Sequence, residues 1–500
     1  MILRPKIEEL KVIGYYVGKL IIGLGISMFI PLLVAVYFKE WNPALDFLLA
    51  SLISFTAGHF LLSLIPRSKE MNWTQGMVVA SLCWLLAMFL GAIPLYLSGH
   101  FANFLDACFD AMSGFATTGL TLIRDLDHLS YSHNIWRHLM MFIGGQGIVV
   151  IALTFFVRGV GSAFSIYVGE AREEKILPNV IQTARFIWLV SFVWLVLGTL
   201  LLAGAGIFEG MKPSRAFLHG LMLFMAGWDT GGFAPQSQNI LYYHSSLFET
   251  ITLIIFIIGS LNFGLHYALW TGNRKEIYRN VETATFFITI LVTFALVVVG
   301  LVKTSFYSGN LALFRRSFYQ LLSGHSGTGY MTIYKEQFVQ GWGPLALFGL
   351  IIAMGIGGCS SSTSGGIKIL RVGILFRGFL KQVRELMLPE SGVIVQKFHH
   401  FKERILEDSQ VKSAALILLA YVFLYLFGAV AGMFFGYPFE LSLFESVSAG
   451  ANVGLSCGIT SESMPVLLKV VYIFQMWCGR LEFMAVFVLF GFIGALIRGK

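Results

Sequence analysis

Charged side chains are scarce in this sequence of 500 residues: Asp, Glu, Lys and Arg make up 12% of it, whereas 56% of the residues are hydrophobic. Soluble globular proteins carry roughly twice that share of charge, so a soluble protein is excluded. Cysteine is also rare, and the five cysteines stand singly, without CxxC spacing or neighbouring histidines at ligand spacing. We therefore expect free thiols and no metal centre.

Long apolar runs fill most of the chain. Runs of about 20 residues, which suffice to cross a hydrocarbon layer of roughly 30 Å, lie at about 14–37, 44–66, 73–98, 134–157, 182–205, 244–270, 277–302, 343–375, 411–436 and 466–497. We expect an all-α, multi-pass protein of the lipid bilayer with about ten transmembrane helices. Lys and Arg gather in one set of loops, above all between Lys368 and Lys412, and basic loops are cytoplasmic. Both termini are therefore predicted to be cytoplasmic, and the net charge of +8 needs no nucleic-acid partner.

One short pattern occurs four times. A glycine followed by a large apolar or aromatic residue stands at Gly119, Gly232, Gly329 and Gly454. The residues one position earlier are Thr118, Gly231, Thr328 and Val453, and those two positions earlier are Thr117, Thr230, Gly327 and Asn452. This is a degenerate form of the Thr-Val-Gly-Tyr-Gly loop, whose carbonyls replace the hydration shell of potassium. Four copies in one chain would close a ring.

Each copy belongs to a larger unit of membrane helix, half-helix, loop and membrane helix. The half-helices are expected at 104–113, 215–226, 311–323 and 439–448. The units divide the chain into a two-helix leader and four pore repeats, at 1–71, 72–181, 182–276, 277–408 and 409–500. A half-helix that enters from outside directs the negative end of its dipole toward the membrane centre, so four of them favour a cation in a central pore.

Two ionisable residues adjoin these loops. Asp229 precedes Thr230, where it either adds cation affinity or hydrogen-bonds the back of the loop. His325 lies just before the third loop, where it either has a proton-linked role or fixes its own loop. Both alternatives stay open for each residue.

The apolar run at 343–375 is interrupted by ten small or polar residues: Gly357, Gly358, Cys359, Ser360, Ser361, Ser362, Thr363, Ser364, Gly365 and Gly366. A helix starting near Gly343 rises 1.5 Å per residue, which places Gly358 ~22 Å along it, near mid-membrane. Irregular backbone at that depth survives only inside protein or facing water, so we interpret the segment as a mobile gating loop below the filter. An enzyme that used these serines as nucleophiles would need an adjoining His or carboxylate, which the run lacks, so no enzyme is expected.

A single arginine, Arg480, lies about fifteen residues into the last apolar run. A charge at this depth is costly and usually functional: it either forms an ion pair across helices or sets a positive charge in the pore. Glu482, two positions on, falls on the opposite helix face. Because Arg480 and Gly358 have similar depths, we expect them to face each other across the pore.

Together, the four loops, the Gly/Ser interruption and this arginine resemble the Trk/Ktr/HKT superfamily of potassium transporters, and the leader favours its TrkH/TrkG branch. The resemblance implies potassium uptake across the cell membrane by a homodimer with one pore per subunit. It also implies control by a cytosolic TrkA-like ring that binds nucleotides, with no organic cofactor in this chain. Its filter glycines match the four glycines above, its gating loop matches 357–366, and its barrier matches Arg480.

Ion selectivity depends on the residues at single positions of the four loops. In plant relatives a serine at the first filter position is associated with sodium transport, so Gly119 favours potassium. Two departures from the pattern are Gly327, where a hydroxyl or amide residue is expected, and Asp229. The alternatives are a sodium- or proton-coupled potassium symporter and a less selective conductor of monovalent cations such as sodium or ammonium.

Overall fold

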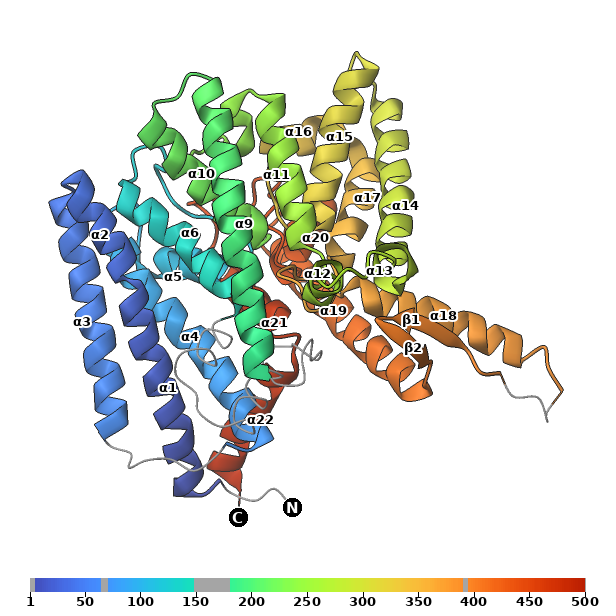
Figure 1. Cartoon of the computed structure of the whole chain (residues 1–500), viewed down its shortest axis with the longest axis horizontal. Helices are drawn as coiled ribbons and strands as arrows, with labels where there is room; N and C mark the ends of the chain where they lie inside the picture. The colour runs from blue at the N-terminus through green and yellow to red at the C-terminus, as the bar shows by residue number, and fades with distance from the viewer. Residues whose placement is uncertain (1–4, 64–70, 148–179, 390–393, 500) are drawn as a thin grey trace.

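The computed structural model describes residues 5–63, 71–147, 180–389 and 394–499. Helices dominate these ranges (Figure 1), and the two strands found within them form one antiparallel hairpin, β1 (Lys397–His400) with β2 (Lys402–Ile405). The longer helices before the third loop are α1 (Ile7–Ser27), α2 (Phe29–Phe38), α3 (Trp41–Ser63), α4 (Trp73–Leu97), α5 (Phe104–Phe115), α6 (Tyr131–Gln146), α9 (Val180–Phe208), α10 (Pro213–Trp228), α11 (Ser246–Gly259), α12 (Phe263–Trp270), α14 (Val281–Thr304) and α15 (Asn310–His325). Those after it are α17 (Gly343–Ile356), α18 (Ile369–Glu385), α19 (Asp408–Phe434), α20 (Phe439–Gly450), α21 (Val466–Arg480) and α22 (Met484–Arg498). Two short helices are α13 (Glu276–Arg279) and α16 (Lys335–Gln337).

The described residues contain seven helical stretches long and apolar enough to cross a membrane, or up to nine if two bent pairs each count as one span. These stretches coincide with nine of the ten predicted runs. The tenth, 134–157, begins in α6 and continues outside the described residues, as does the later part of the predicted repeat 72–181. The predicted class, an all-α multi-pass membrane protein, is confirmed.

Three of the predicted runs are not continuous helices. The run at 244–270 bends by 96° between α11 and α12, and the run at 466–497 bends by 111° between α21 and α22. The run at 343–375 stops at Ile356 and resumes only at Ile369. In the first two cases the helix breaks beside a glycine, Gly259 or Gly479, that lies against a carbonyl at the end of the half-helix in its own repeat. A Cβ atom at either position would overlap that carbonyl, so glycine permits the close approach.

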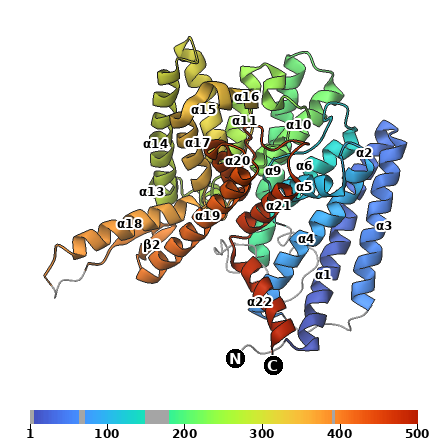
Figure 2. The same ribbon diagram turned by 180° about the vertical axis from the view of Figure 1, so that it is seen from behind.

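The four predicted half-helices exist as α5, α10, α15 and α20. They pack in cyclic order: α6 of the first repeat contacts α10, α11 contacts α15, α17 contacts α20, and α21 of the last repeat contacts α5. Each repeat therefore supplies a wall for the half-helix of the next one, and the fourth repeat closes on the first. Helices far apart in sequence, such as the red α21 and the blue-to-cyan α5, lie side by side for this reason (Figure 2).

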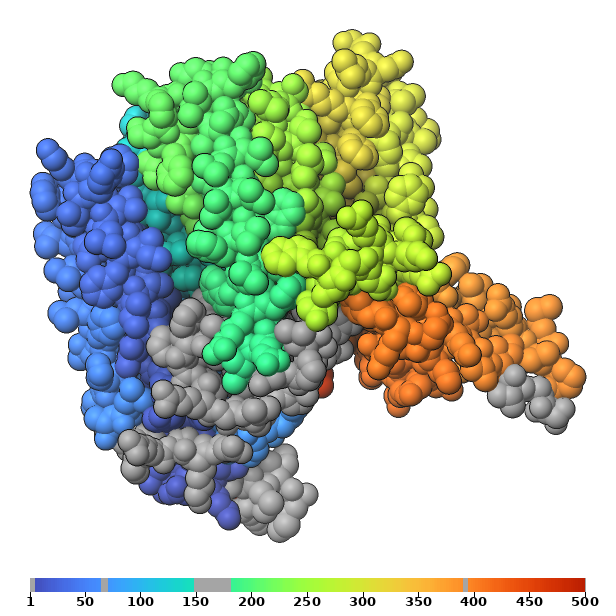
Figure 3. Space-filling model, viewed as in Figure 1, coloured from blue at the N-terminus to red at the C-terminus, as the bar shows by residue number. Residues whose placement is uncertain are grey.

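The leader helices α1, α2 and α3 pack against α4 and α6 at one edge of the molecule (Figure 1). The start of α1 and the end of α22 lie at the same end of the bundle (Figures 1 and 2). This agrees with termini on one side of the membrane, and the cytoplasmic assignment of that side stays a prediction. On the other edge, α18 projects from the bundle beside the hairpin and α19, the orange part of Figure 3.

Candidate functional site

The four repeated loops share one backbone conformation. Their filter glycines have φ of 92° at Gly119, 75° at Gly232, 79° at Gly329 and 92° at Gly454, and the residues two positions earlier also have positive φ, at Thr117, Thr230, Gly327 and Asn452. Between them, the N–H of Thr118, Gly231, Thr328 and Val453 donates to a half-helix carbonyl at 2.7–2.9 Å. A conformation that residues with side chains rarely adopt, repeated four times at matched positions, indicates one common design.

The loops close into a ring. A Cβ atom built on each filter glycine would overlap the carbonyl oxygen of the residue before the filter glycine in the next repeat. The contacts run from Gly119 to Gly231, from Gly232 to Thr328, from Gly329 to Val453 and from Gly454 to Thr118. Only glycine allows an approach this close at positive φ, which explains why all four positions carry it. The four loops thus converge on one axis at the ends of the four half-helices.

Buried polar side chains hold three of the loops from behind. The residues nine positions before the filter glycine are Asp110, Gln320 and Glu445 in the first, third and fourth repeats. Asp110 accepts a hydrogen bond from the Thr121 hydroxyl. Gln320 donates to the Tyr330 carbonyl at 3.0 Å, and Glu445 accepts from the Ser456 hydroxyl at 2.6 Å. These residues were not predicted from the sequence, although a polar residue at constant spacing in three apolar half-helices is a usable signal.

In the first repeat this support is an ion pair. Arg137 on α6 lies 2.9 Å from Asp110, and both side chains are at most 1% exposed. The same guanidinium lies over the ring of Phe233, 4.0 Å from its centroid. Arg137 thereby ties the first loop to the residue that follows the filter glycine of the second.

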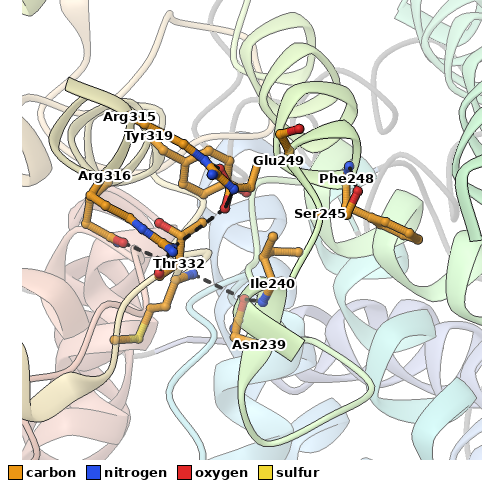
Figure 4. A network of polar contacts seen from close by, with 12 residues as sticks. Asn239, Ile240, Ser245, Phe248, Glu249, Arg315, Arg316, Tyr319 and Thr332 are labelled. Carbon is orange, nitrogen blue, oxygen red and sulfur yellow. Dashed lines mark hydrogen bonds and ion pairs between the residues drawn. The ribbon is translucent and has the colours of Figure 1, made fainter. Parts of the chain in front are cut away.

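A polar network joins the second and third repeats (Figure 4). The Asn239 amide donates to the Gly232 carbonyl at 3.1 Å and accepts from the Met331 N–H at 3.1 Å. It therefore fixes the chain segments that follow the filter glycines of the second and third repeats. Beside it, Arg315 holds Glu249 through two hydrogen bonds of 2.6 and 2.9 Å. Such a two-point contact fixes orientation as well as distance.

The Gly/Ser segment 357–366 lies directly beneath the ring and is buried except for Ser360. The Thr363 hydroxyl lies 3.0 Å from the Trp228 carbonyl and 2.9 Å from the Gly259 carbonyl, and the Cys359 N–H donates to the Ser260 carbonyl at 3.0 Å. The Cys359 N–H and the Thr363 hydroxyl thus find their partners inside protein, as polar groups of an irregular segment at this depth require. We call this segment the intramembrane loop.

Gly327 departs from the other three repeats for a packing reason. Thr117 accepts from Arg480, Thr230 lies 3.3 Å from the Thr363 hydroxyl, and Asn452 donates to Thr118. At Gly327 a Cβ atom would lie 2.7 Å from the Ser364 hydroxyl oxygen. A side chain there would displace the Ser364 hydroxyl, so glycine leaves room for this residue of the intramembrane loop.

Arg480 is the last residue of α21, not a mid-helix residue as predicted. Its guanidinium donates to the Thr363 carbonyl at 2.7 Å and to the Gly144 carbonyl at 2.6 Å. It is therefore in contact with the intramembrane loop at Thr363, and the expectation that it faces Gly358 across the pore stays a prediction. Glu482 turns away from it and pairs with Arg371 at the start of α18.

Of the two accessory candidates, Asp229 contacts the preceding repeat and His325 contacts a helix of its own repeat. Asp229 accepts a hydrogen bond from Gln146 of α6 at 2.9 Å. His325 lies 2.9 Å from the Thr289 hydroxyl of α14 and packs on the ring of Phe286. These contacts join the end of α15 to the adjacent helix, and a role of His325 in fixing its own loop stays a prediction.

Fold and site together define a multi-pass helical membrane protein built from four half-helix repeats around a buried ring of loops. The chain belongs to the TrkH family, described as cation transport protein, whose model matches residues 44–494. It is 31% identical over 484 residues to an uncharacterized cation transporter of Methanocaldococcus jannaschii, covering 97% of this chain and 96% of that protein. It is 29% identical to the Trk system potassium uptake protein TrkH of Escherichia coli K12, covering 95% and 97%.

A solved structure agrees with the architecture. The crystal structure of the potassium transporter TrkH from Vibrio parahaemolyticus matches with a TM-score of 0.81 over 96% of this chain and 98% of that one, at 24% identity. This likeness establishes the fold.

Proposed function

We propose that this protein takes up potassium across the cell membrane through the ring formed by its four loops. The observation that carries the proposal is the cyclic contact of each filter glycine with the carbonyl of the next repeat, because a closed ring of backbone carbonyls can replace the hydration shell of potassium. The transporters of Escherichia coli that resemble the chain are named potassium uptake proteins. The residues proposed to line the filter are 117–119, 230–232, 327–329 and 452–454.

The intramembrane loop and Arg480 form the proposed gate. Together they occupy the space beneath the ring, and the guanidinium joins the loop to the Gly144 carbonyl of the first repeat. A guanidinium stays protonated when buried. At an effective dielectric of ~20 it repels a potassium ion 6 Å away by about 3 kcal/mol. That is enough to slow ion passage until the loop and the arginine move apart.

The resemblance also supplies the proposed partners. We infer a homodimer with one pore per subunit and a cytosolic TrkA-like ring that binds nucleotides and controls opening. The basic residues of α18 and of the hairpin support a cytosolic contact there, since Arg377, Lys381, Lys402 and Arg404 lie close together in the chain beyond the intramembrane loop. Movement of α18 would reach the gate directly, because α18 continues from it at Ile369.

Rubidium flux into vesicles that contain the purified protein tests this function. Uptake down a rubidium gradient alone, with little sodium uptake, is the expected result for a passive potassium pore. Acceleration by an inward proton or sodium gradient would instead identify a coupled symporter, for which Asp229 and His325 are the candidate residues. Equal uptake of sodium would identify a less selective conductor, and absence of all cation uptake would overturn the proposal.

A further inference from the structure

A cavity of about 380 Å³ lies between α18, the β-hairpin and α19, and the intramembrane loop reaches it through Ser360. Its polar wall carries Lys368, Arg371, His400 and Arg404. Among the described residues that line the cavity there is no Asp or Glu. The lining therefore brings three permanently charged side chains and a histidine together around one partly open space outside the ring of loops. Of these, Arg371 also pairs with Glu482, and His400 lies 4.0 Å from Glu282.

Arg404 has the position expected of a ligand contact. It lies on β2 opposite Phe398 of β1, and its Nε atom is buried without a hydrogen-bond partner in the described part of the chain. A buried donor without an acceptor costs free energy. An acceptor inside the cavity would remove that cost.

The chemistry of the wall selects the ligand class. Guanidinium groups bind phosphate oxygens through paired N–H donors, and lysine adds a compact charge. Leu370, Ile374 and Ile417 form an apolar part of the same lining. A cavity of this size matches small-molecule sites in other proteins. A ligand that joins a phosphate group to an apolar part fits both the charged and the apolar residues of the lining.

We propose that this cavity binds a phosphate-bearing ligand, either the headgroup of an anionic phospholipid or a soluble phosphate compound, and that its binding acts on the intramembrane loop. The proposed effect on the intramembrane loop rests on the proposed gating function. Two residues that line the cavity connect it to the intramembrane loop. Lys368 donates to the Ser364 carbonyl of the loop, and Ser360, a residue of the loop, donates its N–H to Glu282 of α14 at 2.6 Å. A phosphate that draws Lys368 toward Arg404 would weaken the hold of Lys368 on Ser364.

Binding is measured on the full-length protein in discs of phosphatidylcholine. One arm titrates inorganic pyrophosphate at constant ionic strength, and the other replaces part of the lipid by phosphatidylglycerol. Calorimetry and the midpoint of thermal unfolding report binding. We expect one arm to stabilise the protein, and Arg404→Gln to weaken that response by about tenfold, the worth of one charge-assisted hydrogen bond. The responding arm identifies the source of the phosphate.

Lys402→Gln is the matched control. Lys402 lies on the same strand as Arg404 and is exposed, and it does not line the cavity, so the substitution removes the same charge outside the proposed site. Ser413→Phe is the second variant: it fills the cavity from α19 without changing charge, and it should abolish the response as well. An equal loss in Lys402→Gln and Arg404→Gln would show diffuse charge attraction and overturn the site. So would a wild-type protein that responds in neither arm.

Rubidium flux is the second readout. In the wild type the responding arm should change flux at least about threefold, and in Arg404→Gln it should not. Binding without any change in flux would overturn the link to the intramembrane loop. A protein that binds the probe but conducts no cation would leave the cavity assignment intact and overturn the proposed function, so the two failures are distinguishable.

Discussion

Lys469 of α21 and Asp106 of α5 form an ion pair of 2.6 Å, although they are 363 positions apart in the chain. Their side chains are 4% and 0% exposed. The pair joins the fourth repeat to the first, at the same junction where Gly454 lies against the Thr118 carbonyl. It therefore fastens the point at which the chain must close on itself.

Lys469→Met should lower stability strongly, because it leaves the Asp106 carboxylate buried without its partner, at a cost of about 3–5 kcal/mol. Thermal unfolding of the solubilised protein measures the loss. Glu462→Gln is the control, since it breaks an exposed pair with Arg124 in which both side chains are 48% exposed and should cost at most about 1 kcal/mol. Equal losses in the two variants would show that burial does not set the contribution of the Lys469 pair.

Gly119→Ser should lower the preference for potassium over sodium. Its Cβ atom would overlap the Gly231 carbonyl and displace one wall of the ring. Paired rubidium and sodium fluxes into vesicles measure the preference. Gly99→Ser carries the same backbone strain, at φ 75°, but its Cβ atom would have no neighbour within 4 Å. Unchanged ion preference in a folded Gly119→Ser protein would remove the filter assignment.

Arg480→Ala should raise cation flux, because it removes both the positive charge and the hydrogen bonds to Thr363 and Gly144. Arg480→Lys keeps the charge with fewer donors in a different geometry, so its flux should stay near the wild-type value. Vesicle flux and thermal unfolding are measured on the same preparations. A well-folded Arg480→Ala protein with unchanged or reduced flux would exclude Arg480 as a barrier.

Thr363→Val should loosen the intramembrane loop, since the variant loses the hydroxyl contacts to the Trp228 and Gly259 carbonyls at nearly constant volume. Cys359, 1% exposed within the same loop, reports the change when the other four cysteines are replaced by alanine. Its reaction with a thiol reagent should become roughly tenfold faster, as expected for the loss of about one buried hydrogen bond.

Thr363→Ser is the control for that experiment, because it keeps the hydroxyl and should react at the wild-type rate. A Thr363→Val protein in which Cys359 stays as unreactive as in the wild type would show that these contacts do not hold the loop closed.

The sequence alone predicted the parts of the molecule that repeat. Four glycines at matched distances from four half-helices were recognisable because the same backbone geometry requires the same residue each time. The breaks after Gly259 and at Arg480 were not predicted, because a glycine or arginine in an apolar run looks the same whether the helix continues or bends by about 100°. The contacts of Arg480, Glu482 and His325 were also missed, since their partners lie on helices distant in the chain.

The contact between Gly327 and Ser364 has a consequence for how such a protein can vary. In a pore assembled from identical subunits, every substitution appears in all quadrants at once, so a residue removed to admit a loop would be removed four times. Here one polypeptide supplies all four quadrants, and only the third has a glycine, Gly327, at this position beneath the ring. A substitution can therefore change the contact with the intramembrane loop in that quadrant alone, while the other three keep their polar side chains.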